Sequence, residues 1–195
     1  MKRLHLVIIS LLFPLLLCAQ HLEFMGIPLD GTITQFQAKL IKKGFHISKL
    51  SKALDKGIRA YNGRFSGRKV VVATYYNPKS KNVYAVRVML DDDSFKNGES
   101  AFDVFDYYTD LINAKYSDIS KEDTDDKATT ENARRHYAIT VYHDSTKETI
   151  RGTIRIQVVE NTDYYNTYYV TLDYVDGLNS FLSGFIDYIE DMNDL

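Results

Sequence analysis

Apolar residues recur along this chain at two periods, one typical of helices and the other typical of strands. Three stretches have the helical period, from Thr32 to Gly44, from Ser100 to Tyr116 and from Leu178 to Met192. The first of them opens with Thr32 and Gln35, which have the spacing of a capping box. The pattern therefore predicts three amphipathic helices.

Between these helices the period changes to two. We predict strands at 61–65, 68–76, 83–91, 136–143, 148–160 and 167–175. In the longest of them, Ile154 and Ile156 lie on one face of the strand. Arg155 and Gln157 lie on the other face, which we expect to be in contact with water.

The predicted elements follow the order helix, strands, helix, strands, helix. Strands joined by short turns form antiparallel meanders, and such runs beside helices favour an α+β fold. We expect a single domain over residues 20–195, a two-layer sandwich in which an antiparallel meander sheet carries helices on one face. Because a helix precedes each meander, the order suggests a degenerate helix-plus-meander duplication. Residues 117–134 are mostly charged and polar, and they predict a mobile acidic loop.

The first residues have the pattern of a secretory signal peptide. Lys2 and Arg3 form a positive start, an apolar run follows to Leu17, and Ala19 is a small residue at its end. The apolar run is shorter than the roughly 20 residues that cross a bilayer, and no stop-transfer pattern follows it. We expect residues 1–19 to be cleaved off as the signal peptide. The remaining chain would have no transmembrane span and would be exported to the periplasm or secreted.

Cys18, the one cysteine of the chain, leaves an alternative open. In a lipoprotein its thiol would carry a diacylglycerol and anchor the chain to the outer membrane. Such sites usually have a small residue before the cysteine, whereas Leu17 is bulky. Cleavage after Cys18 would leave a mature chain without a thiol, which excludes disulfides, thiolate metal sites and cysteine nucleophiles.

Charge and motif spacing narrow the function classes. The formal net charge is −2, and loss of the cations Lys2 and Arg3 with the leader would move it to −4. A mildly acidic domain without a basic stripe favours no nucleic-acid partner. His136 and His143 lie seven positions apart on one predicted strand, hence on opposite faces, and cannot share a metal ion. Since the chain also lacks a glycine-rich phosphate loop, we expect no cofactor.

Carboxylates are abundant, and they keep one enzymatic alternative open. Asp91, Asp93 and Glu99 have only part of the spacing of a calcium loop. A pair of acids needs only to meet in space to hydrolyse a glycosidic bond. The turn at Asp91–Asp93 and the loop near Asp123 are the candidate places for such a pair, so a periplasmic hydrolase acting on glycan or peptide is the alternative function.

Tyrosine is the unusual feature of the composition, with 15 Tyr and no Trp. A tyrosine ring joins apolar surface to a hydroxyl group, which suits contact with proteins or glycans, although such rings also form cross-strand pairs at the edge of a core. The candidate ligand-binding residues on the predicted open face are Tyr142, Arg155, Gln157, Tyr169 and Thr171. The sequence thus favours an exported, non-enzymatic binding module of the cell envelope, with a protein or glycan as its unidentified ligand.

Residues 24–33 (FMGIPLDGTI), with Phe36, 39–40 (KL) and 43–45 (KGF), resemble the opening of a family of small exported bacterial proteins. The resemblance covers about a quarter of the mature chain. The resemblance implies no activity and no catalytic residue for this chain, because neither is established for that family. More loosely, the order of helices and meanders resembles the β-lactamase-inhibitor-like fold, which implies a layout and no particular function.

Overall fold

The computed structural model describes residues 21–91, 95, 98–124, 126–128, 131–162 and 167–184. The predicted signal peptide, the candidate lipidation site Cys18 and the end of the last predicted helix lie outside these residues. Asp93 of the acidic turn also lies outside them.

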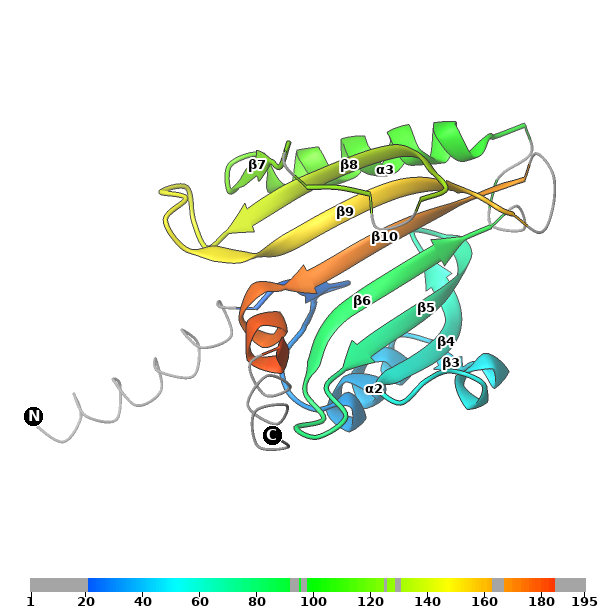
Figure 1. Ribbon diagram of the computed structural model, residues 1–195, viewed down its shortest axis with the longest axis vertical. Coiled ribbons are helices and arrows are strands. Elements are labelled where there is room, and N and C mark those ends of the chain that lie inside the picture. Colours follow the sequence, from blue (N-terminus) through cyan, green and yellow to red (C-terminus); the bar gives the residue numbers. More distant parts are fainter. Residues whose placement is uncertain are drawn as a thin grey trace, which may run out of the picture.

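Eight strands form one antiparallel sheet in the order β3-β4-β5-β6-β10-β9-β8-β7 (Figure 1). Along the chain these strands are β3 (His46–Ile47), β4 (Ile58–Phe65), β5 (Arg68–Tyr76), β6 (Val83–Leu90), β7 (Ser120–Glu122), β8 (Ala133–Tyr142), β9 (Ile150–Glu160) and β10 (Tyr168–Asp176). Two short strands, β1 (Glu23–Phe24) and β2 (Ile27–Pro28), pair with each other in a separate hairpin.

Helices α2 (Ile33–Lys42) and α3 (Ala101–Tyr116) begin at capping boxes formed by Thr32 with Gln35 and by Ser100 with Asp103. A short 3₁₀ helix, η1 (Lys49–Lys52), follows β3, and residues 177–184 form a further helix after β10. The ribbon shows α2 behind β4 and β5, and α3 beside β8 and β9 on the same side of the sheet (Figure 1).

One hydrophobic core lies between this face of the sheet and the helices. The sheet contributes a cross-strand row of buried side chains, Tyr61, Val72, Val88, Leu172 and Ile156. The helices contribute buried residues at helical spacing, including Phe36 and Leu40 from α2 and Val104, Tyr108 and Ile112 from α3. The prediction of an α+β sandwich with an antiparallel meander sheet is confirmed.

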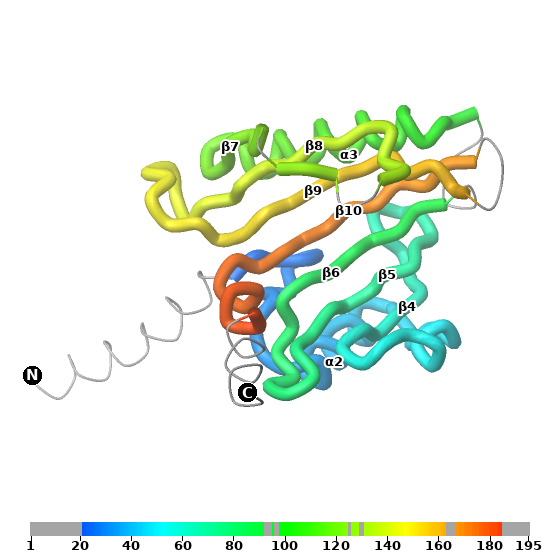
Figure 2. Tube along the Cα trace, viewed as in Figure 1, coloured from blue at the N-terminus to red at the C-terminus, as the bar shows by residue number. Residues whose placement is uncertain are grey.

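The chain passes twice through the same order of elements. Each half consists of a helix, a short edge strand and a three-stranded antiparallel meander: α2, β3 and β4–β6, then α3, β7 and β8–β10. The two halves join where their last strands, β6 and β10, pair antiparallel in the middle of the sheet (Figure 2). This repeated topology is the arrangement that a helix-plus-meander duplication would produce.

The segment 117–134, which we expected to be a loop, contains a strand. Residues Ser120–Glu122 form β7, which pairs with Ile139–Val141 of β8 at the edge of the sheet. Lys121 and Glu122 are exposed, as is typical of an edge strand that charged side chains protect from further pairing. A strand of this kind shows no hydrophobic alternation, so the sequence pattern could not reveal it.

Candidate functional site

The face of the sheet that turns away from the helices, called here the open face, is crossed by rows of cross-strand partners. One row runs Ala73, Arg87, Asp173, Arg155 and Ala138, from β5 to β8. The neighbouring row runs Asn62, Val71, Met89, Thr171, Gln157 and His136, from β4 to β8. Residues from both halves of the chain therefore meet on this face.

Ion pairs occupy the centre of the open face. The Arg87 guanidinium donates to both carboxylate oxygens of Asp173, with Nε–Oδ1 2.6 Å and Nη2–Oδ2 2.8 Å. The side chain of Asp173 is only 6% exposed, and a charge in such a place is costly to bury without a partner. The hydrogen bond with Asp173 raises the pKa of Arg87, in spite of the opposing effect of burial. The pair therefore joins β6 to β10 through a bidentate contact.

A second ion pair fastens the loop after β7 to the open face. Arg155 donates to both oxygens of Asp126, with Nε–Oδ2 2.6 Å and Nη2–Oδ1 2.7 Å. Nε2 of His136 lies 3.1 Å from the same carboxylate. Burial raises the pKa of Asp126, but the hydrogen bonds and charges of Arg155 and His136 outweigh it and hold that pKa below its ordinary value. Asp126 is thus a charged clamp between the loop and strands β8 and β9.

The structure separates the five predicted ligand-binding residues. Thr171 and Gln157 are direct cross-strand partners, and Arg155 lies on the same face of β9, two positions from Gln157. Tyr169 lies one row beyond Thr171, opposite Val159, where its side chain is half-buried.

Tyr142 lies apart from the other four, opposite Ile150 near the far end of β9. Ile150 is five residues from Arg155, so about 16 Å of strand separates the two positions. Tyr142 therefore does not belong to the same site.

The expectation of a solvated face at Gln157 is wrong. Gln157 has 0% exposed surface and Thr171 has 3%. Asp126 of the loop after β7 contacts Arg155 and His136, which neighbour Gln157, and alternation within one strand contains no information about contacts from such a distant segment. The Thr171 hydroxyl oxygen is buried without a hydrogen-bond partner among the described residues. Neither side chain is available to a ligand in this arrangement.

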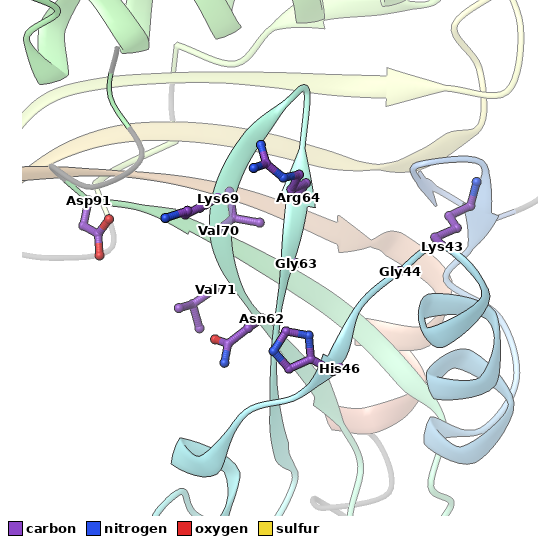
Figure 3. A pocket seen from close by; sticks show the side chains of 10 residues that line it. All are labelled: Lys43, Gly44, His46, Asn62, Gly63, Arg64, Lys69, Val70, Val71 and Asp91. Carbon is purple, nitrogen blue, oxygen red and sulfur yellow. The ribbon is translucent and has the colours of Figure 1, made fainter. Parts of the chain in front are cut away.

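An elongated depression, called here the trough, lies on the open face beside these residues. It consists of two adjoining hollows of about 590 and 500 Å³ that share Val71 and Asp91 as lining residues. In the first hollow, the cross-strand partners His46 and Asn62 lie between Val71 and the C-terminal end of α2 (Figure 3). Lys69 extends toward Asp91 (Figure 3). The second is lined by apolar groups of Leu50, Met89 and Tyr169 among others.

Of the residues that line the trough, only Tyr169 and Asp91 were candidates from the sequence pattern. The other lining residues, among them His46, Asn62, Val71 and Met89, come from four different strands. Each is an ordinary strand residue on its own, and only the pairing register places the four together. No local signal in the sequence could have found them.

Two described carboxylates of the open face, Asp173 and Asp126, lack the features of an acid pair of the kind that glycoside hydrolysis needs. Asp173 and Asp126 are each held by an arginine, and the pKa of Asp126 is lowered, whereas a general acid needs a raised pKa. Asp123 accepts a hydrogen bond from Thr140 at 3.2 Å. Across the residues that the structure describes, no group of three or more His, Cys, Asp or Glu side chains could hold a metal ion.

Comparisons of this chain with protein-family models, with curated proteins and with solved structures find no match. Of the helices in the described ranges, none has the length and apolar character needed to span a bilayer.

Proposed function

We propose that this protein is an exported, non-enzymatic binding module of the cell envelope, and that the trough on its open face holds the ligand. The observation that carries the proposal is the composition of the trough. Partly exposed Val71 and Met89 form an apolar floor, and Tyr169 adds an aromatic ring beside it. Apolar and aromatic side chains with a few polar groups nearby are typical of sites that bind by contact.

The alternative of a hydrolase has less support. Hydrolysis by a carboxylate pair needs one acid that keeps its proton and one that is charged. The arginines occupy both carboxylate oxygens of Asp173 and of Asp126, and the pKa of Asp126 is held below its ordinary value. These carboxylates therefore stabilise the open face and are poorly placed to act on a substrate. Export itself is supported by the leader pattern of residues 1–19.

A photocrosslinker at a single position tests the proposal. Met89 in the trough is replaced by benzoylphenylalanine in the full chain, and intact producing cells are irradiated. We expect a discrete adduct, with protein or glycan, that is identified by mass spectrometry. The matched control has the same amino acid in place of Leu111, an exposed apolar residue of α3. Absence of an adduct at position 89, or the same adducts at both positions, would contradict the proposal.

A further inference from the structure

The cations around the trough differ from those elsewhere on the open face. Arg87 and Arg155 each form a bidentate ion pair with a carboxylate. Lys43 and Lys69 line the first hollow, and neither has a carboxylate partner in the described parts of the chain.

Arg64 is also unpaired with an acid there, and it donates to the backbone oxygen of Gly67 at 2.8 Å. Against these three cations the trough contains one described carboxylate, Asp91. The whole chain has a formal net charge of −2. The trough therefore concentrates positive charge on a protein that is otherwise mildly acidic.

The side chains divide the trough into two chemical parts. Lys69 points along the trough toward Asp91, and the His46 ring lies beside Asn62 in the middle of the first hollow (Figure 3). Lys43 points away from the centre and contributes charge only at the rim (Figure 3). The second hollow, beyond Val71, is mainly apolar. A ligand that fits both parts has a negative group and, next to it, an apolar or aromatic group.

The length of the trough favours an extended chain as this ligand. Five of its lining residues come from five strands that are neighbours in the sheet: His46, Asn62, Val71, Met89 and Tyr169. Neighbouring strands lie about 4.8 Å apart, so the trough runs about 19 Å across the sheet. An extended peptide segment spans this distance in about six residues.

We propose that the trough binds an extended acidic peptide segment of a partner protein, with carboxylates near Lys69 and His46 and an apolar or aromatic side chain between Met89 and Tyr169. This inference rests on the proposed binding function and names its class of ligand. Charge complementarity sets the orientation and the association rate, and burial of the apolar side chain contributes most of the affinity.

Random copolymers with defined charge are suitable probes. Fluorescently labelled poly(Glu,Tyr) is titrated with the full chain, and binding is followed by anisotropy. Poly(Glu) has the charge without the aromatic group, and poly(Lys,Tyr) has the aromatic group with the opposite charge. We expect poly(Glu,Tyr) to bind more tightly than poly(Glu), poly(Lys,Tyr) not to bind, and the affinity to fall as salt is added.

Two matched charge reversals locate the binding site. Lys69→Glu lies in the trough, and Lys121→Glu is on the exposed edge strand β7 at the other end of the strand order. Both surface changes are expected to leave the thermal midpoint unchanged. Lys69→Glu is expected to weaken poly(Glu,Tyr) binding by about fivefold to tenfold, and Lys121→Glu by less than about twofold.

Three results would overturn the acidic peptide as the ligand: no binding of poly(Glu,Tyr), equal binding of poly(Lys,Tyr), or equal weakening by the two substitutions. Binding of poly(Glu) as tight as that of poly(Glu,Tyr) would also overturn it, because the apolar hollow would then have no part. If one of these results occurs while the crosslink at position 89 persists, the ligand class is wrong and the binding function stands. If the crosslink is also absent, both proposals fail.

Discussion

Asp176 shows how much a single buried carboxylate does in this fold. It is the last residue of β10, and with 0% of its surface exposed it accepts hydrogen bonds from the backbone amides of Leu22 at 2.8 Å and Asn179 at 2.9 Å. The second of these bonds caps the helix that begins after β10. Nδ1 of His21 lies 3.1 Å from the same carboxylate. One side chain thereby fastens the beginning of the described chain to the end of the sheet.

The contact between His21 and Asp176 makes a pH-dependent contribution to stability. The hydrogen bond with Asp176 raises the pKa of His21, and burial only partly opposes this effect. A raised pKa in the folded state means that the stabilisation is fully present below the ordinary histidine pKa of 6.5. It is lost as the pH rises through the folded-state pKa.

We therefore expect His21→Ala to lower the thermal midpoint more at about pH 5.5 than at about pH 8.5, with a difference of a few degrees. The measurement is thermal unfolding of the wild-type and variant chains at the two pH values. His46→Ala is the matched control, because His46 is exposed and forms no ion pair with the residues that the structure describes. An equal effect of His21→Ala at both pH values would contradict the role given to its charge.

At the scale of elements, the segment between β7 and β8 departs most from what its sequence predicts. Its composition is that of a solvated loop, yet the backbone amide of Asp123 donates to the Ala138 carbonyl, and Asp126 is clamped by Arg155 and His136. The contacts are polar and reach from one element to another. Hydrophobic periodicity contains no signal for such contacts, which is why this segment could not be assigned from the sequence.

Asp126→Asn tests the clamp. The substitution keeps the shape of the side chain but removes its charge, so the pair with Arg155 weakens and the loop opens more often. We expect tryptic cleavage after the exposed Lys127 to become faster by about fivefold or more under native conditions. Asp110→Asn, at an exposed position on α3, is the matched control and should not change the cleavage rate. An unchanged rate for Asp126→Asn would show that other contacts hold the loop.

At the scale of the whole molecule, stability depends on the seam where the two halves meet. The seam is the antiparallel pairing of β6 with β10, and the ion pair of Arg87 with Asp173 lies across it. On the other face the same strands bury Val88 and Leu172 in the common core. Because one core serves both halves, we expect them to unfold together in a single transition.

A double-mutant cycle measures the ion pair at this seam. Arg87→Ala and Asp173→Ala each leave a partner charge in a mostly buried place, so each is expected to lower the free energy of unfolding by about 2–4 kcal/mol. The double variant should lose about 1–2 kcal/mol less than the sum of the two, because it leaves no unpaired charge. Urea denaturation of the four chains gives these values. Strict additivity of the two losses would mean that the pair makes no energetic contribution.

The sequence by itself determined the types and the order of the elements. Helical stripes, capping pairs such as Thr32 with Gln35, and strand alternation are interactions within a few residues, so they can be read locally. From them followed the α+β sandwich and the helix-plus-meander order of each half. The alternation of apolar and polar residues in β9 also correctly predicted which residues share a face, since Arg155 and Gln157 both lie on the open face.

Only the tertiary structure decided which of these residues a ligand can reach. Gln157 and Thr171 are covered, Tyr142 lies far along the sheet, and the trough is assembled from His46, Val71 and neighbouring residues that no local pattern connects. The physical reason is that exposure and proximity depend on strand order, register and the path of a charged loop. These are set by contacts between residues distant in the chain, which the period of a single element does not encode.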